Sequence, residues 1–207
     1  MSNIGQLIII SAPSGTGKST IIQAVKNRID NIGYAVSHTS RLPRDGEHNG
    51  TDYFFVPESE FKDMITKNAF VEWAKVYNSY YGTSFNTLKE NTAKGLDVIL
   101  DIDPQGAANI RTHFEESILI FLLPPSIEIL QNRLLQRGKD SESVIKSRMA
   151  LAEENINQCL WYDYVVINDD LEKAVTEVCS IIIAERKRTA RMLSDETLKS
   201  ALKLSNI

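Results

Sequence analysis

The strongest structural signal in this chain is the stretch LIIISAPSGTGKST, residues 7–20. Its first part, residues 7–11, is a short apolar run, which is typical of a strand buried on both faces of a parallel sheet. A turn with Gly15 and Gly17 follows, and the next apolar positions, Ile21, Ile22 and Val25, predict a helix. A strand, a glycine-rich turn and a helix in this order are the context of a P-loop.

The residue types in the turn suit the binding of phosphate. Glycines let backbone N–H groups converge on phosphate oxygens, and a helix N-terminus favours negative charge. Lys18 can reach the β- and γ-phosphates of ATP, and the Ser19 hydroxyl can bind Mg²⁺. The first glycine of the motif is replaced by Ala12, which we interpret as a minor variation. The predicted ATP site comprises Ala12, Pro13, Ser14, Gly15, Thr16, Gly17, Lys18, Ser19 and Thr20; the alternative is an ordinary glycine-rich turn.

A P-loop also needs a carboxylate near the metal. The apolar run 98–100 ends in Asp101, at the end of a predicted strand where the side chain can face the loop. An aspartate in this place can instead be only the cap of the next helix. Next to a P-loop we favour a metal site, with Ser19 and Asp101 holding Mg²⁺ largely through water.

Further apolar runs predict the rest of the sheet, at 7–11, 98–101, 118–123 and 164–167, and an apolar stripe predicts a helix over 171–185. Strands that alternate with helices indicate an α/β fold, here a P-loop three-layer sandwich with a parallel sheet core. At 207 residues the chain is long enough for one sizeable core. We assign this core to about 1–36, 89–125 and 159–207 of a single domain.

Two segments interrupt this alternation. Residues 37–88 are polar and predict an inserted subdomain of short strands and turns, and residues 126–158 contain two helical patterns joined by a polar connection. After residue 185 come the basic positions 186–188 and 191 and a weakly amphipathic pattern that ends at residue 207. We interpret this tail as a solvated or oligomer-packing helix without a catalytic role.

The composition restricts the partners of the chain. The net charge is −4, so no basic field favours a nucleic-acid polymer. No stretch approaches the length of a membrane span, and the two cysteines, Cys159 and Cys179, lack metal-ligand spacing. We expect free thiols, a cytoplasmic location and either a monomer or a small homo-oligomer.

The polar segment holds a second concentration of positive charge. Arg41 and Arg44 flank Pro43, which stiffens the turn, and Tyr53 and Tyr81 add hydroxyl groups further along. Arginine forks match phosphate oxygens well, so the turn can hold a monophosphate away from the P-loop. A surface turn with solvated arginines is an equally good interpretation of the charge alone.

Residues and short motifs along the chain fall, in order, at the spacing of one family's sequence signature. This series comprises Thr39-Ser40-Arg41, Arg44, Glu47, Gly50, Tyr53, Phe55, Glu72-Trp73, Tyr80-Tyr81-Gly82, Leu100 to Asp103, Gln105-Gly106, Pro124-Pro125-Ser126, Arg133, Arg137-Gly138 and Asn168 to Leu171. In this series the sequence resembles the guanylate kinase family, over roughly residues 5–187. The departures are conservative, since Ser40 and Thr83 both keep a hydroxyl group.

The resemblance implies transfer of the γ-phosphoryl group of ATP to GMP, and to dGMP as well, with Mg²⁺. It makes 37–88 a GMP-binding insertion and 126–158 a helical lid. It assigns the GMP phosphate to Arg41, Arg44, Tyr53 and Tyr81 and the guanine to Ser37, Glu72, Thr83 and Asp103. The expected catalytic residues are Lys18, Arg41, Arg137 and Arg148, and Arg133 and Asn168 are expected at the ATP.

Two other functions remain to be distinguished from this one. A guanylate-kinase-like binding module would hold a phosphopeptide with the same arginines, but a degraded P-loop would be expected there, whereas Gly17, Lys18 and Ser19 are intact. A kinase for another nucleotide or a small alcohol would not need Glu72, whose carboxylate can accept the two N–H donors of guanine.

Overall fold

The computed structural model describes residues 5–76, 78–136, 142–193, 200–201 and 203. Its centre is a five-stranded parallel sheet in the order β2-β7-β1-β8-β9. The strands are β1 (Leu7–Ser11), β2 (Ile32–Tyr34), β7 (Asp97–Asp101), β8 (Ile118–Leu123) and β9 (Tyr164–Ile167). The four strands that the apolar runs predict are confirmed, and β2 is an additional one.

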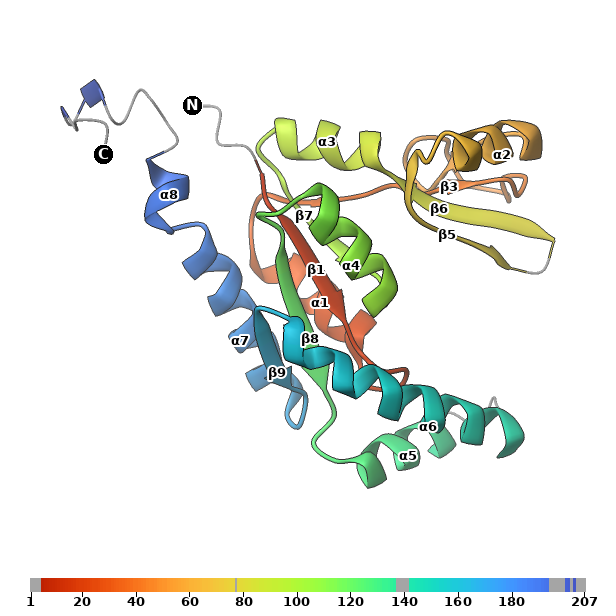
Figure 1. The fold of residues 1–207 in the computed structure, drawn as a ribbon, viewed down its shortest axis with the longest axis vertical. Coiled ribbons are helices and arrows are strands. Elements are labelled where there is room, and N and C mark those ends of the chain that lie inside the picture. Colours follow the sequence, from red (N-terminus) through yellow and green to blue (C-terminus); the bar gives the residue numbers. More distant parts are fainter. Residues whose placement is uncertain (1–4, 77, 137–141, 194–199, 202, 204–207) are drawn as a thin grey trace.

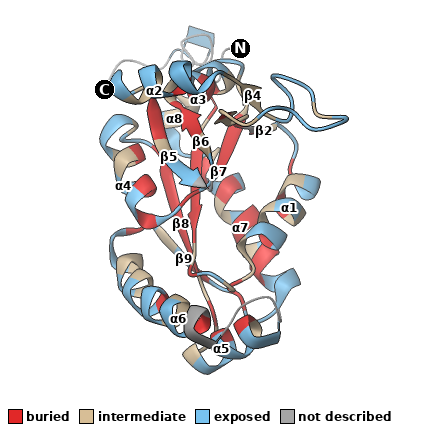
Figure 2. Ribbon diagram, turned by 90° about the vertical axis from the view of Figure 1, so that its right-hand side faces the viewer, coloured by how far each residue is buried: buried red, intermediate tan, exposed pale blue. Residues whose placement is uncertain are grey.

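Helices cover both faces of this sheet. On one face, α1 (Lys18–Arg28) and α7 (Leu171–Glu185) pack on Ile8, Ile10 and their neighbours. On the other, α3 (Phe85–Ala93) and α4 (Pro104–His113) pack on Leu7, Ile9 and Leu119. Successive residues of a strand point to opposite faces, which is why the continuous apolar run of β1 serves both layers. Figure 2 shows the buried strands between the two helical layers, so the predicted α/β sandwich is confirmed.

The inserted segment forms a separate sheet with the order β4-β3-β6-β5. It consists of β3 (His38–Thr39), β4 (Phe54–Phe55), β5 (Phe70–Val76) and β6 (Ser79–Ser84), with the helix α2 (Glu58–Thr66) packed on it. Phe61 of α2 is fully buried and stacks on Phe70, with ring centroids 4.4 Å apart. Figure 1 shows this unit projecting from the core beside α3.

The segment 126–158 contains α5 (Ile127–Gln136) and α6 (Glu142–Asn157), followed by a 3₁₀ turn (Gln158–Trp161). Both helices lie at the end of the sheet where β1 turns into α1 (Figure 1). Leu130 and Leu134 of α5 are fully buried. A Cβ on Gly15 would lie 2.9 Å from Leu134 Cδ2, so α5 packs directly against the glycine-rich turn.

The sequence predicts a solvated or oligomer-packing tail after α7, but two arginines of this segment pair with a buried carboxylate of the core. The carboxylate of Asp97, at the start of β7, is 3% exposed and accepts hydrogen bonds from Arg186 Nε at 2.7 Å and Arg191 Nη2 at 3.2 Å. It also accepts one from the Gln6 backbone N–H. Arg191 reaches it from the short helix α8 (Thr189–Met192). A buried carboxylate needs such partners, and these arginines supply them.

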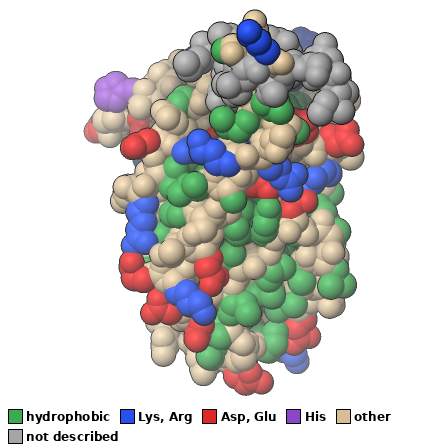
Figure 3. All heavy atoms as spheres, turned by 90° about the vertical axis from the view of Figure 1, so that its left-hand side faces the viewer, with side chains coloured by type: hydrophobic (Ala, Val, Ile, Leu, Met, Phe, Trp, Pro, Cys, Tyr) green, Lys and Arg blue, Asp and Glu red, His purple; other side chains and the backbone are tan. Residues whose placement is uncertain are grey.

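Figure 3 views the side of the molecule that carries α7, where apolar side chains lie between scattered charged ones. Ile183 of α7 and Val165 and Ile167 of the edge strand β9 are exposed apolar residues. An exposed edge strand is a surface on which another chain can pair. None of the helices in the described part of the chain is both long and apolar enough to span a bilayer.

Candidate active site

The glycine-rich turn lies between β1 and α1, and its backbone requires glycine at two positions. Gly15 and Gly17 have φ values of +96° and +98°, in the region that side chains other than glycine rarely adopt. A Cβ on Gly17 would also lie 2.6 Å from Asn168 Nδ2. Helix α1 begins directly after it at Lys18, so the helix N-terminus opens onto the turn.

Asn168 and Arg133 hold this turn from outside. The Asn168 amide donates to the Thr16 carbonyl at 2.6 Å, and Arg133 Nη1 donates to the same oxygen at 3.4 Å. Arg133 Nη2 in turn donates to the Asn168 carbonyl at 3.1 Å. Asn168 is only 6% exposed. Both residues, which the resemblance links to ATP, therefore contact the backbone of the P-loop in this structure.

The cation of the turn has a carboxylate beside it. Lys18 Nζ lies 2.5 Å from Asp101 Oδ1 at the end of β7, and their side chains are 19% and 43% exposed. Lys18 also approaches the Ile102 carbonyl at 3.5 Å, and that oxygen accepts a 2.8 Å hydrogen bond from Ser11. The Asp101 side chain thus faces the P-loop, on the side where the sequence places it.

A cavity of about 380 Å³ lies over this turn. The core side supplies all the predicted P-loop residues except the fully buried Thr16, together with Asp101. The other wall is one face of α6, formed by Arg148, Leu151, Ala152 and Asn155. These four have the spacing i, i+3, i+4 and i+7 of a single helix face. The cavity therefore joins Arg148 to the P-loop, while Arg137 lies outside the described residues.

A second cavity of about 420 Å³ adjoins the first, because Leu151 and Asn155 line both. It contains Asp103, which caps α4 by accepting the Gly106 N–H at 2.8 Å, and it extends to Trp161. Of the residues that the resemblance assigns to guanine, Asp103 is the one that lies on the core.

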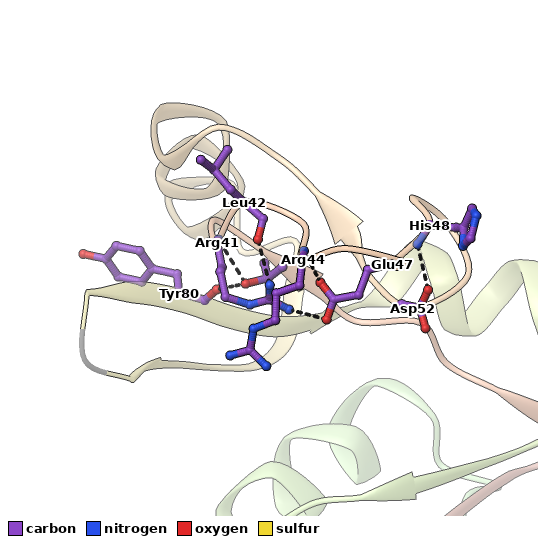
Figure 4. A network of polar contacts seen from close by, with 8 residues as sticks. Arg41, Leu42, Arg44, Glu47, His48, Asp52 and Tyr80 are labelled. Carbon is purple, nitrogen blue, oxygen red and sulfur yellow. Dashed lines mark hydrogen bonds and ion pairs between the residues drawn. The ribbon is translucent and has the colours of Figure 1, made fainter.

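Arg41 and Arg44, the candidate residues for the acceptor phosphate, lie on the insertion in a network of polar contacts (Figure 4). Arg41 Nη2 donates to Glu47 Oε1 at 2.9 Å, and its guanidinium carbon lies 5.6 Å from the centres of the Tyr53 and Phe55 rings. The rings of Tyr53 and Tyr81 are 5.9 Å apart. Arg41, Tyr53 and Tyr81 are thereby brought together. In Figure 4 the exposed guanidinium of Arg44 extends from the turn toward the core.

The other candidate guanine residues form a hydrogen-bonded chain across β6 and its neighbours. Ser37 Oγ and Thr83 Oγ1 are 3.1 Å apart, and Thr83 donates to Glu72 Oε1 at 2.9 Å. Burial raises the pKa of the Glu72 carboxyl, and the charges of Asp103 and Asp101 raise it further. Such a half-buried carboxylate gains from a partner that donates hydrogen bonds to it.

Two features of the site escaped the sequence analysis. The wall of α6 at Leu151, Ala152 and Asn155 follows the helical spacing i, i+3, i+4 and i+7 from Arg148, a pattern that could have revealed it. Glu47 belongs to the matched series, but its contact with Arg41 depends on how residues 41–47 fold back. The spacing of these two residues contains no signal for that contact.

The oxygen donors around the P-loop fit magnesium. Among the described residues no group of three or more His, Cys, Asp or Glu side chains could hold a metal ion. Mg²⁺ at nucleotide sites needs no such group, since it keeps water and binds substrate phosphates together with one or two protein oxygens. The exposed Ser19 and the half-exposed Asp101 both line the cavity and supply oxygens of this kind.

Comparison with known proteins agrees with this geometry. Residues 4–185 match the family model described as guanylate kinase. A guanylate kinase from Geobacter sulfurreducens is 48% identical over 93% of this chain and 95% of its own, and one from Caldanaerobacter subterraneus is 48% identical over 90% and 91%. The crystal structure of guanylate kinase from Anaplasma phagocytophilum superposes with a TM-score of 0.68 at 32% identity, covering 98% of both chains. The chain therefore belongs to the guanylate kinase family.

Proposed function

We propose that this chain transfers the γ-phosphoryl group of ATP to GMP, giving ADP and GDP, with Mg²⁺ in the cytoplasm. The observation that carries the proposal is that two sites with groups suited to binding phosphate lie on different parts of one chain. One is the P-loop cavity with Lys18 and Asp101, and the other is the arginine turn of the insertion beside Glu72.

The donor site holds the triphosphate of ATP. Backbone N–H groups of residues 12–20 surround the phosphates, and Lys18 moves from Asp101 to the β- and γ-phosphate oxygens. Ser19 and Asp101 would hold Mg²⁺, largely through water, and the ion would neutralise charge on the phosphates. Asn168 and Arg133 hold the backbone of the loop at the Thr16 carbonyl. Asn168 contacts the adenine, and Arg133 lies close to the transferred phosphoryl group.

The acceptor site binds both the phosphate and the guanine of GMP. Arg41, Arg44, Tyr53 and Tyr81 bind the phosphate, and the guanine is held by Ser37, Glu72, Thr83 and, from the core, Asp103. The Glu72 carboxylate accepts the adjacent N1–H and N2–H donors of guanine. Adenine lacks this pair of donors on that edge, so it would leave a half-buried carboxylate without a partner. A preference for GMP and dGMP over AMP follows.

Transfer requires the two sites to come together. The insertion, 37–88, and the lid, 126–158, close over the core, and Arg137 and Arg148 then neutralise charge on the moving phosphoryl group. A GMP phosphate oxygen attacks the γ-phosphorus in line while the bond to the β-phosphate oxygen breaks and ADP leaves. The attacking oxygen is already anionic near neutral pH, so no general base is needed.

A panel of acceptors and donors tests the proposal with the purified chain. We expect ATP-dependent formation of GDP from GMP, weaker activity with dGMP, and little or none with AMP, CMP or glycerol. Phosphopeptide binding without turnover would instead identify a binding module. Efficient transfer to another nucleotide or to an alcohol would show that Glu72 does not select the acceptor. Sedimentation of the same sample decides between a monomer and a homo-oligomer.

A further inference from the structure

Glu47 uses both oxygens of its carboxylate within the arginine turn. Oε1 accepts from Arg41 Nη2 at 2.9 Å, and Oε2 accepts from the Arg44 backbone N–H at 2.7 Å (Figure 4). The Glu47 N–H also donates to the Arg44 carbonyl at 3.1 Å, which closes the turn. These bonds hold the pKa of the Glu47 carboxyl below its usual range, first through Arg41 and then through Arg44. One side chain thus joins a phosphate-binding guanidinium to the backbone of the second arginine.

Contacts on other sides leave Arg41 little freedom. Nη1 donates to the Leu42 carbonyl at 2.7 Å, and the guanidinium packs against the rings of Tyr53 and Phe55. Its side chain is 17% exposed. A guanidinium has five N–H donors, so donors remain for a phosphate after the bonds to Glu47 and Leu42. The side chain is therefore fixed before any ligand arrives.

A carboxylate at this place has two opposing effects on an incoming phosphate. Its negative charge repels the anion and partly neutralises Arg41. Its hydrogen bonds order a long side chain that would otherwise lose rotamer entropy on binding. Charge alone predicts that removing the carboxylate tightens GMP binding, whereas ordering predicts that removal weakens it. The sign of the change separates the two effects.

We propose that Glu47 is a positioning residue for the acceptor phosphate, which holds Arg41 and the backbone of Arg44 in the geometry that the phosphate meets. The inference rests on the proposed function, in which these two arginines bind GMP. It assigns to Glu47 no contact with the substrate: it acts through the arginines.

The test compares Glu47→Ala, Glu47→Gln and Arg41→Ala with a matched control, Asp52→Ala. Asp52 is an exposed carboxylate of the same loop whose hydrogen bond goes to the His48 backbone N–H at 2.7 Å. The readouts are the KM for GMP, the KM for ATP, and the inhibition constant of guanosine, which carries the base without the phosphate. Guanosine therefore reports whether the insertion and its guanine site remain folded.

We expect Glu47→Ala to raise the KM for GMP by about tenfold, since ordering outweighs charge, and to leave the KM for ATP and guanosine inhibition unchanged. Glu47→Gln should have an intermediate effect, because its single carbonyl oxygen can serve only one of the two donors. Asp52→Ala should behave as the parent. In the Arg41→Ala background, removing Glu47 should matter less, because one of its two partners is already gone.

Three outcomes would overturn parts of this picture in different ways. An unchanged or lower KM for GMP in Glu47→Ala would mean that charge dominates and the positioning role is wrong. Loss of guanosine inhibition along with GMP affinity would reduce Glu47 to a structural residue of the insertion. An unchanged KM for GMP in Arg41→Ala would refute the proposed function of the turn itself, whatever Glu47 does.

Discussion

The P-loop of the core and the arginine turn of the insertion are both suited to phosphate, but they are constructed differently. The shape of the P-loop depends mainly on its own backbone, through the positive φ values of Gly15 and Gly17, and the side chains of Asn168 and Arg133 hold it from outside. The shape of the arginine turn depends on side chains, above all on Glu47. Backbone contacts allow few substitutions, whereas side-chain contacts can be adjusted singly. Changes at the two sites should therefore affect different substrates and differ in how they can be rescued.

The two sites also differ in what surrounds them. The P-loop cavity already has walls from the core and from α6, and Arg148 lines it. The arginine turn lies on the projecting insertion with Arg44 exposed. The cavity over the P-loop thus has walls from two parts of the chain in this structure, whereas the guanidinium of Arg44 in the arginine turn is open to solvent.

The sharpest separation of the two sites should come from Lys18→Ala. The ammonium group of Lys18 stabilises the negative charge that develops on the phosphates during transfer. Without it kcat should fall by about 10³-fold. GMP affinity, measured by calorimetry, should not change, because the acceptor groups lie on the insertion. Lys62→Ala, an exposed lysine paired with Glu58 on α2, is the control. Activity within tenfold of the parent would contradict the role of Lys18.

On the acceptor side, Glu72→Gln should raise the KM for GMP by about 10- to 150-fold, the value of a lost charge-assisted hydrogen bond. The KM for ATP should stay the same. Equal changes in both constants would show that Glu72 does not belong to a separate guanine site.

The same residue predicts a pH dependence of binding. The pKa of Glu72 is raised by burial and by the charges of Asp103 and Asp101, and only the ionised carboxylate accepts both guanine donors. Guanosine inhibition should therefore weaken as the pH falls toward that raised pKa, at a higher pH than for an ordinary carboxyl. Guanosine is the proper probe because the phosphate of GMP itself titrates near pH 6. In Glu72→Gln this dependence should vanish, and its persistence there would assign it to another group.

Alanine substitutions at two glycines separate the effect of backbone strain from that of a steric clash. Gly17→Ala combines a positive φ with a Cβ 2.6 Å from Asn168 Nδ2, whereas Gly46→Ala in the arginine turn has φ +82° and open space around its Cβ. We expect Gly17→Ala to cost about 1–3 kcal/mol and to lower Tm by several degrees together with ATP affinity. Gly46→Ala should cost less and leave ATP affinity intact. Calorimetric unfolding with and without ATP measures both, and equal losses would mean that the contact with Asn168 is unimportant.

The smallest expected effect is the change in overall size when the two sites close on each other. A bisubstrate analogue that links adenosine and guanosine through a polyphosphate should bring the insertion and the lid inward by hinge motion, excluding water from the γ-phosphate. Small-angle scattering should then give a radius of gyration below those of the free and singly liganded chain. Identical values in all states would rule out closure.

Much of the fold was predictable because its signals are local. The runs 7–11, 118–123 and 164–167 and the helix 171–185 have the bounds that the pattern predicts. Strand β2 was missed because Ile32–Tyr34 is too short to show a period. Helix α2 was missed because its sole fully buried residue, Phe61, is stabilised by Phe70 of a neighbouring strand, which is a tertiary contact.

Some parts of the candidate site could be predicted from the sequence alone and others could not. A single continuous motif indicates the P-loop. Asp101 is expected beside it because the carboxyl ends of parallel strands lie at the same edge of the sheet, and the structure places it there. The candidate acceptor residues come from several strands and loops. Charge alone left the arginine turn undecided, and only resemblance to a family added the guanine residues to it. The contacts of Asn168 and Arg133 with Thr16 depend on how β9 and α5 pack against the loop, which no local pattern contains.

The buried Asp97 carboxylate also joins parts of the chain that the ribosome makes at different times. Its partners come from residue 6 at one end of the sequence and from Arg186 and Arg191 near the other. Removing the cations of a buried carboxylate is strongly destabilising, so the residues made last stabilise the start of a strand made much earlier. A chain truncated before residue 186 should therefore be less stable than the whole chain.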